Sequence, residues 1–343
     1  MARRGIIARR PTIKDVARAA GVSAVTVSRV VNTPGQVQQE TRERIERAMR
    51  ELGYVPNFAA RAMRTRYTRT IGFLVPELTS YPNAAVAQAA EQALAEEGYC
   101  LLVTSSGYRA DREVRALEVL RTRHVDGIIL YVSEEHDAAL GEAVAALDVP
   151  LVILDRSLPV AADTVLSDHA TALSDAVRYL VGLGHRRIAL LQSGLDIRPV
   201  RERQRAFEAA GAAAGLAPGD LRCASVPPTA QSATALPLEL LDGPGRPSAV
   251  IADGSRLLRA VLQAARMRGL AIPRDLSVMG IDAADIAMAA TPEITCILRD
   301  FHAIGRTAAE LMVRRLVAPP PTTQRVVLES QVVLKGSCAA PPS

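Results

Sequence analysis

The sequence is poor in aromatic residues and has no cysteine pattern that would hold a metal or a disulfide framework. Its 343 residues include no Trp, and aromatic side chains make up 3%. The four cysteines are far apart and show no CxxC spacing, which favours reduced thiols in a cytoplasmic protein: Cys100, Cys223, Cys296 and Cys338. No apolar run has the length of a membrane span, so no membrane partner is expected. The opening MARRGIIARRP lacks the apolar segment and cleavage site of a secretory signal, and we expect residues 1–11 to be a flexible basic arm.

Catalytic and cofactor-binding motifs are also missing. The sequence contains no GxSxG, HExxH or Walker motif, and no GxGxxG after an expected strand. Gly182 and Gly184 stand at the end of an expected helix, where glycine is typical of a cap. The five His are too scattered for a metal site. The sequence therefore predicts a protein that is not an enzyme and that holds neither a cofactor nor a metal.

Positive charge is concentrated at the start of the chain. Residues 1–70 contain 15 Lys and Arg against 5 Asp and Glu, a net charge of +10. The remaining 273 residues contain 26 against 31, a net charge of −5. A basic head on a mildly acidic body is typical of a nucleic-acid module joined to another domain. The preference for Arg over Lys continues through the body, so it fits genomic composition as well as DNA contact.

Residues 12–32, TIKDVARAAGVSAVTVSRVVN, predict two short helices joined at Gly21. Thr12 is a good N-cap with Asp15 three residues on, and Ser23 is suited to cap the second helix. The apolar sets Ile13, Val16, Ala17, Ala20 and Val27, Val30, Val31 each fall on one stripe. Ala24, Val25, Thr26, Ser28, Arg29 and Asn32 then face outward. A short helix with small residues and one Arg outward fits the major groove, although an ordinary helical hairpin is the alternative.

A third helix is expected over residues 38–52, with Ile45, Ala48, Met49 and Leu52 as its buried stripe and Gly53 as its end. The next segment, from 57 to 64, predicts a helix of barely two turns that is too short to be stable alone in water. With Arg64, Arg66 and Arg69 nearby, it is suited to fold against DNA. A basic linker between domains is the alternative, and the two interpretations are compatible.

From Thr70 the pattern changes to alternating strands and helices. Apolar runs predict strands at 71–75, 100–104, 127–132, 151–154, 188–192, 249–252 and 277–281. Amphipathic stretches between and after them predict helices at 84–97, 111–121, 138–147, 170–183, 200–214, 255–268 and 302–316. Such strands form parallel sheets covered on both faces, with ligands at their carboxyl ends. Polar residues follow several of these strands: Asp155 and Arg156, Asp253, and Asp282.

Taken together, these segments resemble the LacI/GalR family of bacterial transcriptional regulators. The resemblance runs from TIKDVARAAGVSAVTVSRVVN through ETRERIERAMRELGYVPN, ARAMR and RTIGFLVPEL. It continues with VDGIIL, VPLVILDR, LGHRRIALL, RERQRAF, IPRDLSVMGID and RDFHAIGRTAAELM. It implies a small all-α helix-turn-helix head (12–56) and a hinge helix with linker (57–69). It also implies an α/β periplasmic-binding-protein-like type I core of two lobes (70–335), followed by a tail (336–343).

The resemblance also implies which residues contact DNA. Ala24, Val25 and Arg29 occupy base-reading positions, with Arg29 suited to guanine and Val25 to a thymine methyl. Ser23, Thr26, Ser28, Asn32 and Thr12 are suited to phosphate contacts or helix capping. In the hinge, Met63 stands where many relatives have a Leu that wedges into the minor groove. Asn57, Ala60 and Arg61 complete the expected hinge contact.

For the effector site, the resemblance implies Asp155, Arg203, Asp282 and Phe301. Arg203 is suited to grip hydroxyls or a carboxylate. The alternatives are that it pairs with Glu202 or Glu208 on a helix surface and that Asp282 is a cap. Since Trp is absent, stacking on a pyranose ring is not favoured over a smaller or acidic metabolite. Arg156 and Arg299 are also expected near the cleft.

The function expected from these observations is a DNA-binding transcriptional regulator, by default a repressor, that responds to a small metabolite. Its partners would be a pseudo-palindromic double-stranded operator, a small-molecule effector and a second copy or more of the chain, as a homodimer or tetramer. The alternative is a periplasmic-type solute-binding protein without a role on DNA. The basic head and the lack of an export signal argue against that alternative.

Overall fold

The computed structural model describes residues 11–32, 34–55, 67–228 and 233–342. The chain divides into two compact units, Met1–Thr68 and Arg69–Ser343. Among the described residues, no helix is long and apolar enough to cross a membrane.

The first unit is a bundle of three helices, α1 (Ile13–Ala20), α2 (Ala24–Asn32) and α3 (Gln39–Leu52), with a 3₁₀ turn at Pro34–Gln36. The caps are those that the sequence predicts. The Asp15 carboxylate accepts a hydrogen bond from the Thr12 amide at 2.9 Å, and Gly21 and Gly53 end their helices with positive φ. A small apolar core joins the three helices: Val16, Ala17, Ala20, Val27, Val30, Ile45 and Ala48. Leu52, expected in that core, is 39% exposed, because it lies in the last turn of α3.

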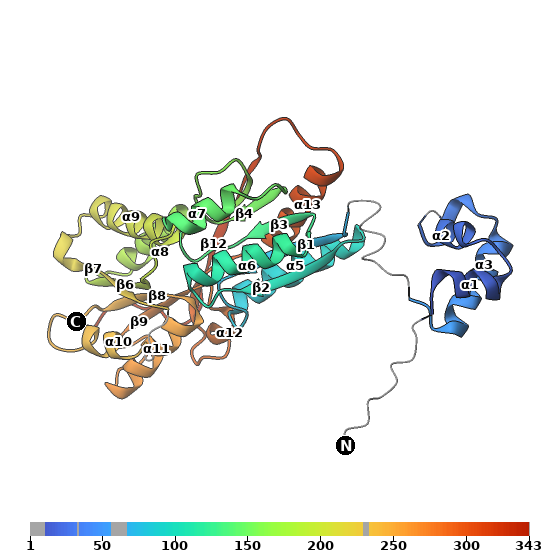
Figure 1. Ribbon diagram of the computed structural model, residues 1–343. Helices are drawn as coiled ribbons and strands as arrows, with labels where there is room; N and C mark the ends of the chain where they lie inside the picture. Colours follow the sequence, from blue (N-terminus) through green and yellow to red (C-terminus); the bar gives the residue numbers. More distant parts are fainter. Residues whose placement is uncertain (1–10, 33, 56–66, 229–232, 343) are drawn as a thin grey trace, which may run out of the picture. The chain divides into compact units, whose positions relative to one another are not determined.

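The second unit contains two lobes, each a six-stranded sheet covered by helices on both faces (Figure 1). Lobe A has the strand order β11-β5-β4-β3-β1-β2, and all its neighbouring strands are parallel. Its strands are β1 (Thr70–Val75), β2 (Cys100–Ser105), β3 (Gly127–Leu130), β4 (Leu151–Leu154), β5 (Asp163–Ser167) and β11 (Arg325–Leu328). One face packs on α5 (Tyr81–Glu96) and α13 (Phe301–Val317), the other on α6 (Ala110–Thr122) and α7 (Ala138–Ala145).

Lobe B has the order β12-β10-β9-β8-β6-β7, parallel except for the edge strand β12. Its strands are β6 (Ile188–Ser193), β7 (Leu221–Val226), β8 (Ala249–Asp253), β9 (Ser277–Ile281), β10 (Thr295–Arg299) and β12 (Ser330–Val333). One face packs on α8 (His169–Gly182) and α9 (Arg198–Ala213). The other packs on α10 (Ala235–Leu240), α11 (Gly254–Met267) and α12 (Ala284–Ala287). A 3₁₀ turn at Pro218–Asp220 precedes β7.

The chain passes between the lobes at three places, after β5, after β10 and between β11 and β12. Two of these crossings end in a capped helix: Asp168 accepts from the Thr171 amide, and Asp300 accepts from the Ala303 amide. The crossings hold the carboxyl ends of the two sheets together. The segment after 335, expected as a tail, packs on lobe B, where the buried Ser337 hydroxyl accepts from the Thr295 amide at 2.8 Å.

Candidate functional site

The outer face of α2 carries residues that the sequence analysis predicts to contact DNA bases. Val27 and Val30 are buried in the head core, so the opposite side of the helix faces outward. Val25 is 61% exposed and Arg29 is exposed. Ala24, expected outside, packs partly against the head core. An exposed Arg and an exposed aliphatic side chain on one short helix match the chemistry of a guanine edge and a thymine methyl.

The remaining head candidates include helix caps. The Ser23 hydroxyl accepts a hydrogen bond from the Thr26 amide at 3.1 Å and bonds the Thr26 hydroxyl at 2.9 Å. Thr12 donates from its hydroxyl to the Asp15 carboxylate at 2.7 Å. Ser28 is half-buried. The side chain of Asn32 and all of Asn57, Ala60, Arg61 and Met63 lie outside the described residues.

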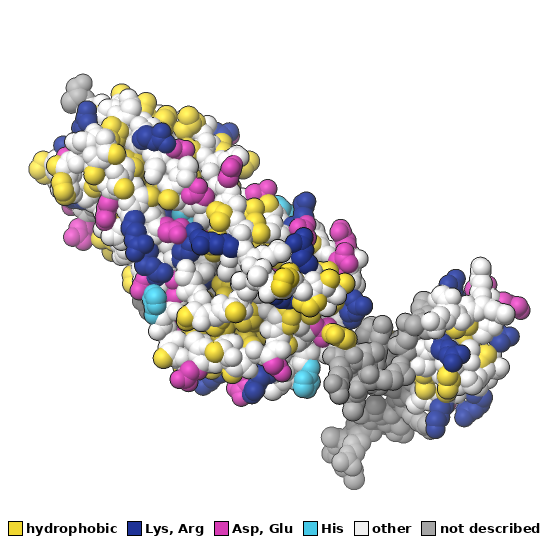
Figure 2. Space-filling view, turned by 90° about the horizontal axis from the view of Figure 1, so that it is seen from above, with side chains coloured by type: hydrophobic (Ala, Val, Ile, Leu, Met, Phe, Trp, Pro, Cys, Tyr) yellow, Lys and Arg dark blue, Asp and Glu magenta, His cyan; other side chains and the backbone are white. Residues whose placement is uncertain are grey.

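Figure 2 shows several Lys and Arg side chains on the visible face of the head, around small apolar patches. Four arginines of α3 contribute to the charge of this unit: Arg42, Arg44, Arg47 and Arg50. Only modest pairing offsets them, such as the exposed Arg42–Glu46 pair at 3.7 Å. Part of the positive charge counted in the sequence is therefore carried on the folded head, and seven of the 15 basic residues at positions 1–70 lie outside the described residues.

In the second unit, a cavity of about 510 Å³ lies between the two lobes at the carboxyl ends of their strands. Of the four residues that the sequence nominates for an effector, Asp155, Arg203 and Asp282 line it. Two of the three, Asp155 and Asp282, directly follow strands (β4 and β9) and have φ of +52°. Such left-handed backbone is uncommon in residues other than glycine and concentrates at functional sites.

Asp155 joins lobe A to lobe B. Its Oδ1 accepts from the Ser167 amide at 3.1 Å and from Arg198 Nη1 at 2.8 Å. Its Oδ2 accepts from Arg299 Nη1 at 2.7 Å and bonds the His169 ring at 2.8 Å. Both carboxylate oxygens are thus occupied by the protein itself. The geometry favours a role at the junction of the lobes for Asp155 rather than direct binding of a ligand.

Asp282 and Arg203 form a second ionic group on the lobe B side. Asp282 Oδ2 accepts from Arg299 Nε at 2.7 Å and lies 3.6 Å from Arg203 Nη2. Arg203 Nη1 is 2.8 Å from Asp253 Oδ1. Arg203 therefore does not pair with Glu202 or Glu208. Asp282 Oδ1 is buried and, within the described residues, accepts no hydrogen bond, which is uncommon for a buried carboxylate oxygen.

Burial and charge set the protonation states of this network. Burial alone would raise the pKa of Asp155, but the His169 ring bonded to it, together with Arg299 and Arg156, holds that pKa well below its usual range. Burial would lower the pKa of Arg299, yet Asp282 and Asp155 raise it well above its usual value. Burial lowers the pKa of His169 and outweighs the attraction of Asp155. At pH 7 we therefore expect a neutral His169 that donates its Nε2 proton to an ionised Asp155.

Phe301, the fourth nominated residue, lies behind this cavity. It is buried, makes an edge-to-face contact with Tyr81 at 5.8 Å and lies under the Arg299 guanidinium at 5.3 Å. The aromatic rings that line the cavity belong to Tyr81, Tyr108 and Tyr131. No motif marks Tyr108 or Tyr131 in the sequence, because each reaches the cavity only through the positions of β2 and β3.

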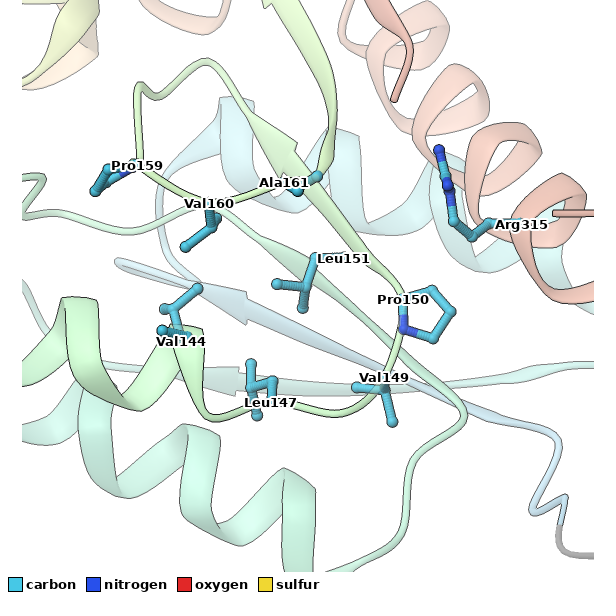
Figure 3. A pocket seen from close by; sticks show the side chains of 11 residues that line it. Val144, Leu147, Val149, Pro150, Leu151, Pro159, Val160, Ala161 and Arg315 are labelled. Atoms are coloured by element: carbon cyan, nitrogen blue, oxygen red, sulfur yellow. The ribbon is translucent and has the colours of Figure 1, made fainter. Parts of the chain in front are cut away.

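A second hollow, of about 380 Å³, lies on lobe A near α7 and β4. In Figure 3, the aliphatic side chains of Val144, Leu151 and Val160 point toward a common space. Its one charged lining residue, Arg315, pairs with Asp163 through Nε at 2.9 Å. This hollow offers fewer polar groups to a ligand than the cavity between the lobes.

Comparison with known proteins matches both units. A family model described as "Bacterial regulatory proteins, lacI family" matches residues 12–57. A model described as "Periplasmic binding protein-like domain" matches residues 177–338. The HTH-type transcriptional regulator CelR of Thermobifida fusca is 34% identical over 337 residues, covering 96% of this chain and 98% of CelR. The ribose operon repressor of Escherichia coli K12 is 31% identical over 328 residues, covering 95% of this chain and 99% of that protein.

Solved structures agree. The structure of a CelR–cellobiose complex is 32% identical, with a TM-score of 0.71 and coverage of 96% of this chain and 100% of that one. The lac repressor dimer bound to operator and the anti-inducer ONPF is 25% identical, with a TM-score of 0.86 and coverage of 97% and 100%.

Proposed function

Because this chain belongs to the lacI family of bacterial regulatory proteins, we propose that it is a transcriptional repressor that binds operator DNA under the control of a small metabolite. One observation carries the proposal. The same chain has an exposed Arg29 on a short helix of its head and, lining a cavity between two lobes, an Asp282 whose Oδ1 accepts no hydrogen bond within the described residues. The first suits a base edge, and the second suits a ligand hydroxyl.

On DNA, the proposal gives Arg29 a guanine contact and Val25 an apolar contact, while Ser23, Thr26, Ser28, Asn32 and Thr12 position the head on phosphates. Asn57, Ala60, Arg61 and Met63 would form the hinge contact in the minor groove. The operator-bound lac repressor is described as a dimer. We extend that assembly to this chain, so that two heads occupy successive half-sites of a pseudo-palindrome.

Control by a metabolite rests on the junction between the lobes. Asp155 holds Arg198, His169 and Arg299, and Glu135 of lobe A accepts from the Arg198 amide at 3.0 Å. A ligand that bonds Asp282 acts on the same network through Arg299. By changing the angle between the lobes, it shifts the populations of DNA-binding and non-binding forms. A thousandfold change in operator affinity needs about 4 kcal/mol of coupling.

The DNA-binding half of the proposal is tested with the full-length protein and DNA from upstream of its own gene. We expect a specific complex in a gel-shift assay that survives an excess of unrelated DNA and weakens steeply as salt rises. If no fragment from that region is bound in preference to unrelated DNA, with or without metabolites, the proposed function is wrong.

The effector half is tested with Asp282→Asn in the full-length protein. The substitution keeps the side chain's shape but removes the charge that faces Arg299 and Arg203, so we expect a ligand that stabilises the wild type to lose at least about tenfold in affinity. Operator binding without ligand should persist. Asp242→Asn, which alters an exposed pair with Arg268, is the control and should leave the response intact. Loss of operator binding together with the response would instead indicate a folding role for Asp282.

A further inference from the structure

Arg256 lines the cavity between the lobes, and one of its guanidinium nitrogens is without a hydrogen-bond partner within the described residues. It lies in the first turn of α11, and its Nη2 donates to the carbonyl oxygen of Pro227 at 3.1 Å and to that of Val226 at 3.5 Å. These two bonds fix the plane of the guanidinium. Its Nη1 is buried and has no hydrogen-bond partner in the part of the chain that the structure describes. A buried, unpaired charged donor is costly, so a partner from outside the chain is expected.

Of the other four arginines at the cavity, Arg156, Arg203 and Arg299 are engaged with the protein, and Arg259 is exposed. Arg203 and Arg299 pair with aspartates, as described above. Arg156 donates to the carbonyl oxygens of Val132 and Asp155 and lies over the Tyr131 ring at 4.7 Å. Among the arginines that line the cavity, within the described residues, Arg256 has the buried nitrogen left without a partner. Arg156, Arg203 and Arg299, which the sequence analysis places near the cleft, are therefore already bonded to other groups of the protein.

The start of α11 adds to the attraction for negative charge. This helix is 14 residues long, and Gly254, Ser255 and Arg256 of its first turn all line the cavity. Asp253, its N-cap, makes no side-chain capping bond, because its carboxylate is bound to Arg203. The first turn and the positive end of the helix dipole thus lie at the cavity that Arg256 lines, where the Ser255 hydroxyl donates to the Asp285 carboxylate.

Resting on the proposed function, we propose that Arg256 makes this protein select effectors that carry an anionic oxygen group, a carboxylate or a phosphate, beside their hydroxyls. Arg256 and Asp282 both line the cavity, and each has a polar atom without a partner within the described residues, so that one molecule would bond both. Its anionic group accepts from Arg256 Nη1 and its hydroxyl donates to Asp282 Oδ1. A neutral sugar would donate a hydroxyl to Asp282 but would offer no negative charge to Arg256.

Across the cavity, Glu77 of lobe A is the competing partner for Arg256. Its carboxylate accepts from the hydroxyls of Thr79 at 2.6 Å and Tyr108 at 3.2 Å. Burial and the Glu77 carboxylate raise the pKa of the Tyr108 hydroxyl, whereas the Arg256 guanidinium acts to lower it. Arg256 of lobe B is therefore close enough to Tyr108 of lobe A to interact with it electrostatically. If Arg256 served to close the lobes on Glu77, it would strengthen the binding of neutral and anionic ligands alike.

The experiment measures binding of matched probes to the full-length protein by calorimetry and thermal shift. The probes are glucose, gluconate and glucose 6-phosphate, and ribose, ribonate and ribose 5-phosphate, so that each anion has its neutral parent. We expect at least one anion to bind about tenfold or more tightly than its parent, as a charged hydrogen bond predicts. Gluconate and ribonate test binding of a carboxylate, and the two sugar phosphates test binding of a phosphate.

Arg256→Gln should remove that preference, lowering the anion's affinity at least about tenfold while changing the parent's by less than about twofold. Arg256→Lys, which keeps the charge, should retain part of the preference even if Arg256→Gln folds poorly. The control is Arg266→Gln, in the last turn of the same helix, exposed and not among the residues that line the cavity, which should leave both affinities unchanged.

The inference is wrong if no anion binds more tightly than its parent, or if Arg256→Gln weakens parent and anion equally. Operator binding is scored separately on the same preparations. A protein that shows the anion preference but binds no operator contradicts the proposed function and leaves the assignment of Arg256 intact.

Discussion

Arg29 is the single side chain on which base recognition by the head should depend most. It is exposed on α2, while Val27 and Val30 on the opposite side are buried. Arg29→Ala should therefore relax the preference at one base pair of each half-site, removing about 1–3 kcal/mol of discrimination. Competition binding against operators substituted at every position measures this effect.

The control for Arg29 is Arg18→Ala, which removes an equally basic and exposed side chain from α1. It should leave the base preference unchanged. An unaltered preference in Arg29→Ala would show that another residue reads the operator.

Two buried histidines should make stability depend on pH between 7 and 5. Burial lowers the pKa of His169 and of His185. As pH falls below about 6.5, the unfolded chain takes up protons that the folded chain does not, so the free energy of unfolding decreases. Each histidine contributes at most about 1.4 kcal/mol per pH unit. Below about pH 4, protonation of Asp155 in the unfolded chain adds to the loss, because its folded pKa is lowered.

Chemical unfolding of the full-length chain at several pH values measures this dependence. His169→Gln keeps a donor toward Asp155 but does not titrate, so its stability should fall less between pH 7 and 5. His302→Gln, at an exposed position on α13, is the control and should follow the wild type. Identical slopes in all three proteins would contradict the assignment.

The site residues show what the sequence could and could not predict. Asp282 and Arg203 were found from family motifs, and both line the cavity. Phe301 was found in the same way but lies behind Tyr81. Arg256 could not be found, because its significance depends on carbonyl oxygens of residues 226 and 227, which only the folded lobe B brings to it.

At the scale of elements, the sequence predicted the strands that are apolar throughout and missed others. All seven expected strands are present. The missed strands include the edge strands β7, β11 and β12, whose residues are mostly exposed or half-buried, and the largely buried β5 and β10, which begin and end with polar residues. Apolar runs identify a strand buried on both faces, whereas an edge strand is defined by pairing with distant residues, such as Ile297 with Val332.

The packing of α5 against α13 depends on one glycine. A Cβ at Gly305 would lie 2.4 Å from the Val86 carbonyl oxygen and 2.8 Å from the Ala89 Cβ. Gly305→Ala must push the helices apart, at a cost of about 1–3 kcal/mol. Gly141→Ala on α7, where no atom lies within 4 Å of the added Cβ, should be neutral or stabilising because alanine favours a helix. Urea unfolding of both variants checks this contrast. Equal effects would show that α5 and α13 adjust freely.

At the scale of the whole molecule, the division of charge should separate the salt dependence of the two binding events. The net charge of +10 lies in residues 1–70, whereas the rest of the chain carries −5. Operator affinity should fall linearly on a log–log plot against salt, with a slope of about −0.9 for each phosphate contacted. For six contacts, that is about a thousandfold between 50 and 200 mM salt.

Ligand binding between the lobes should change far less over the same range. The charged groups there are mostly buried and paired with one another, and buried charges are screened weakly by salt. Titrations of operator and of a stabilising ligand in the same salt series measure both slopes on one preparation. A shallow operator slope would mean that the basic head does not displace counterions from phosphates, and the charge asymmetry would then need an explanation other than DNA.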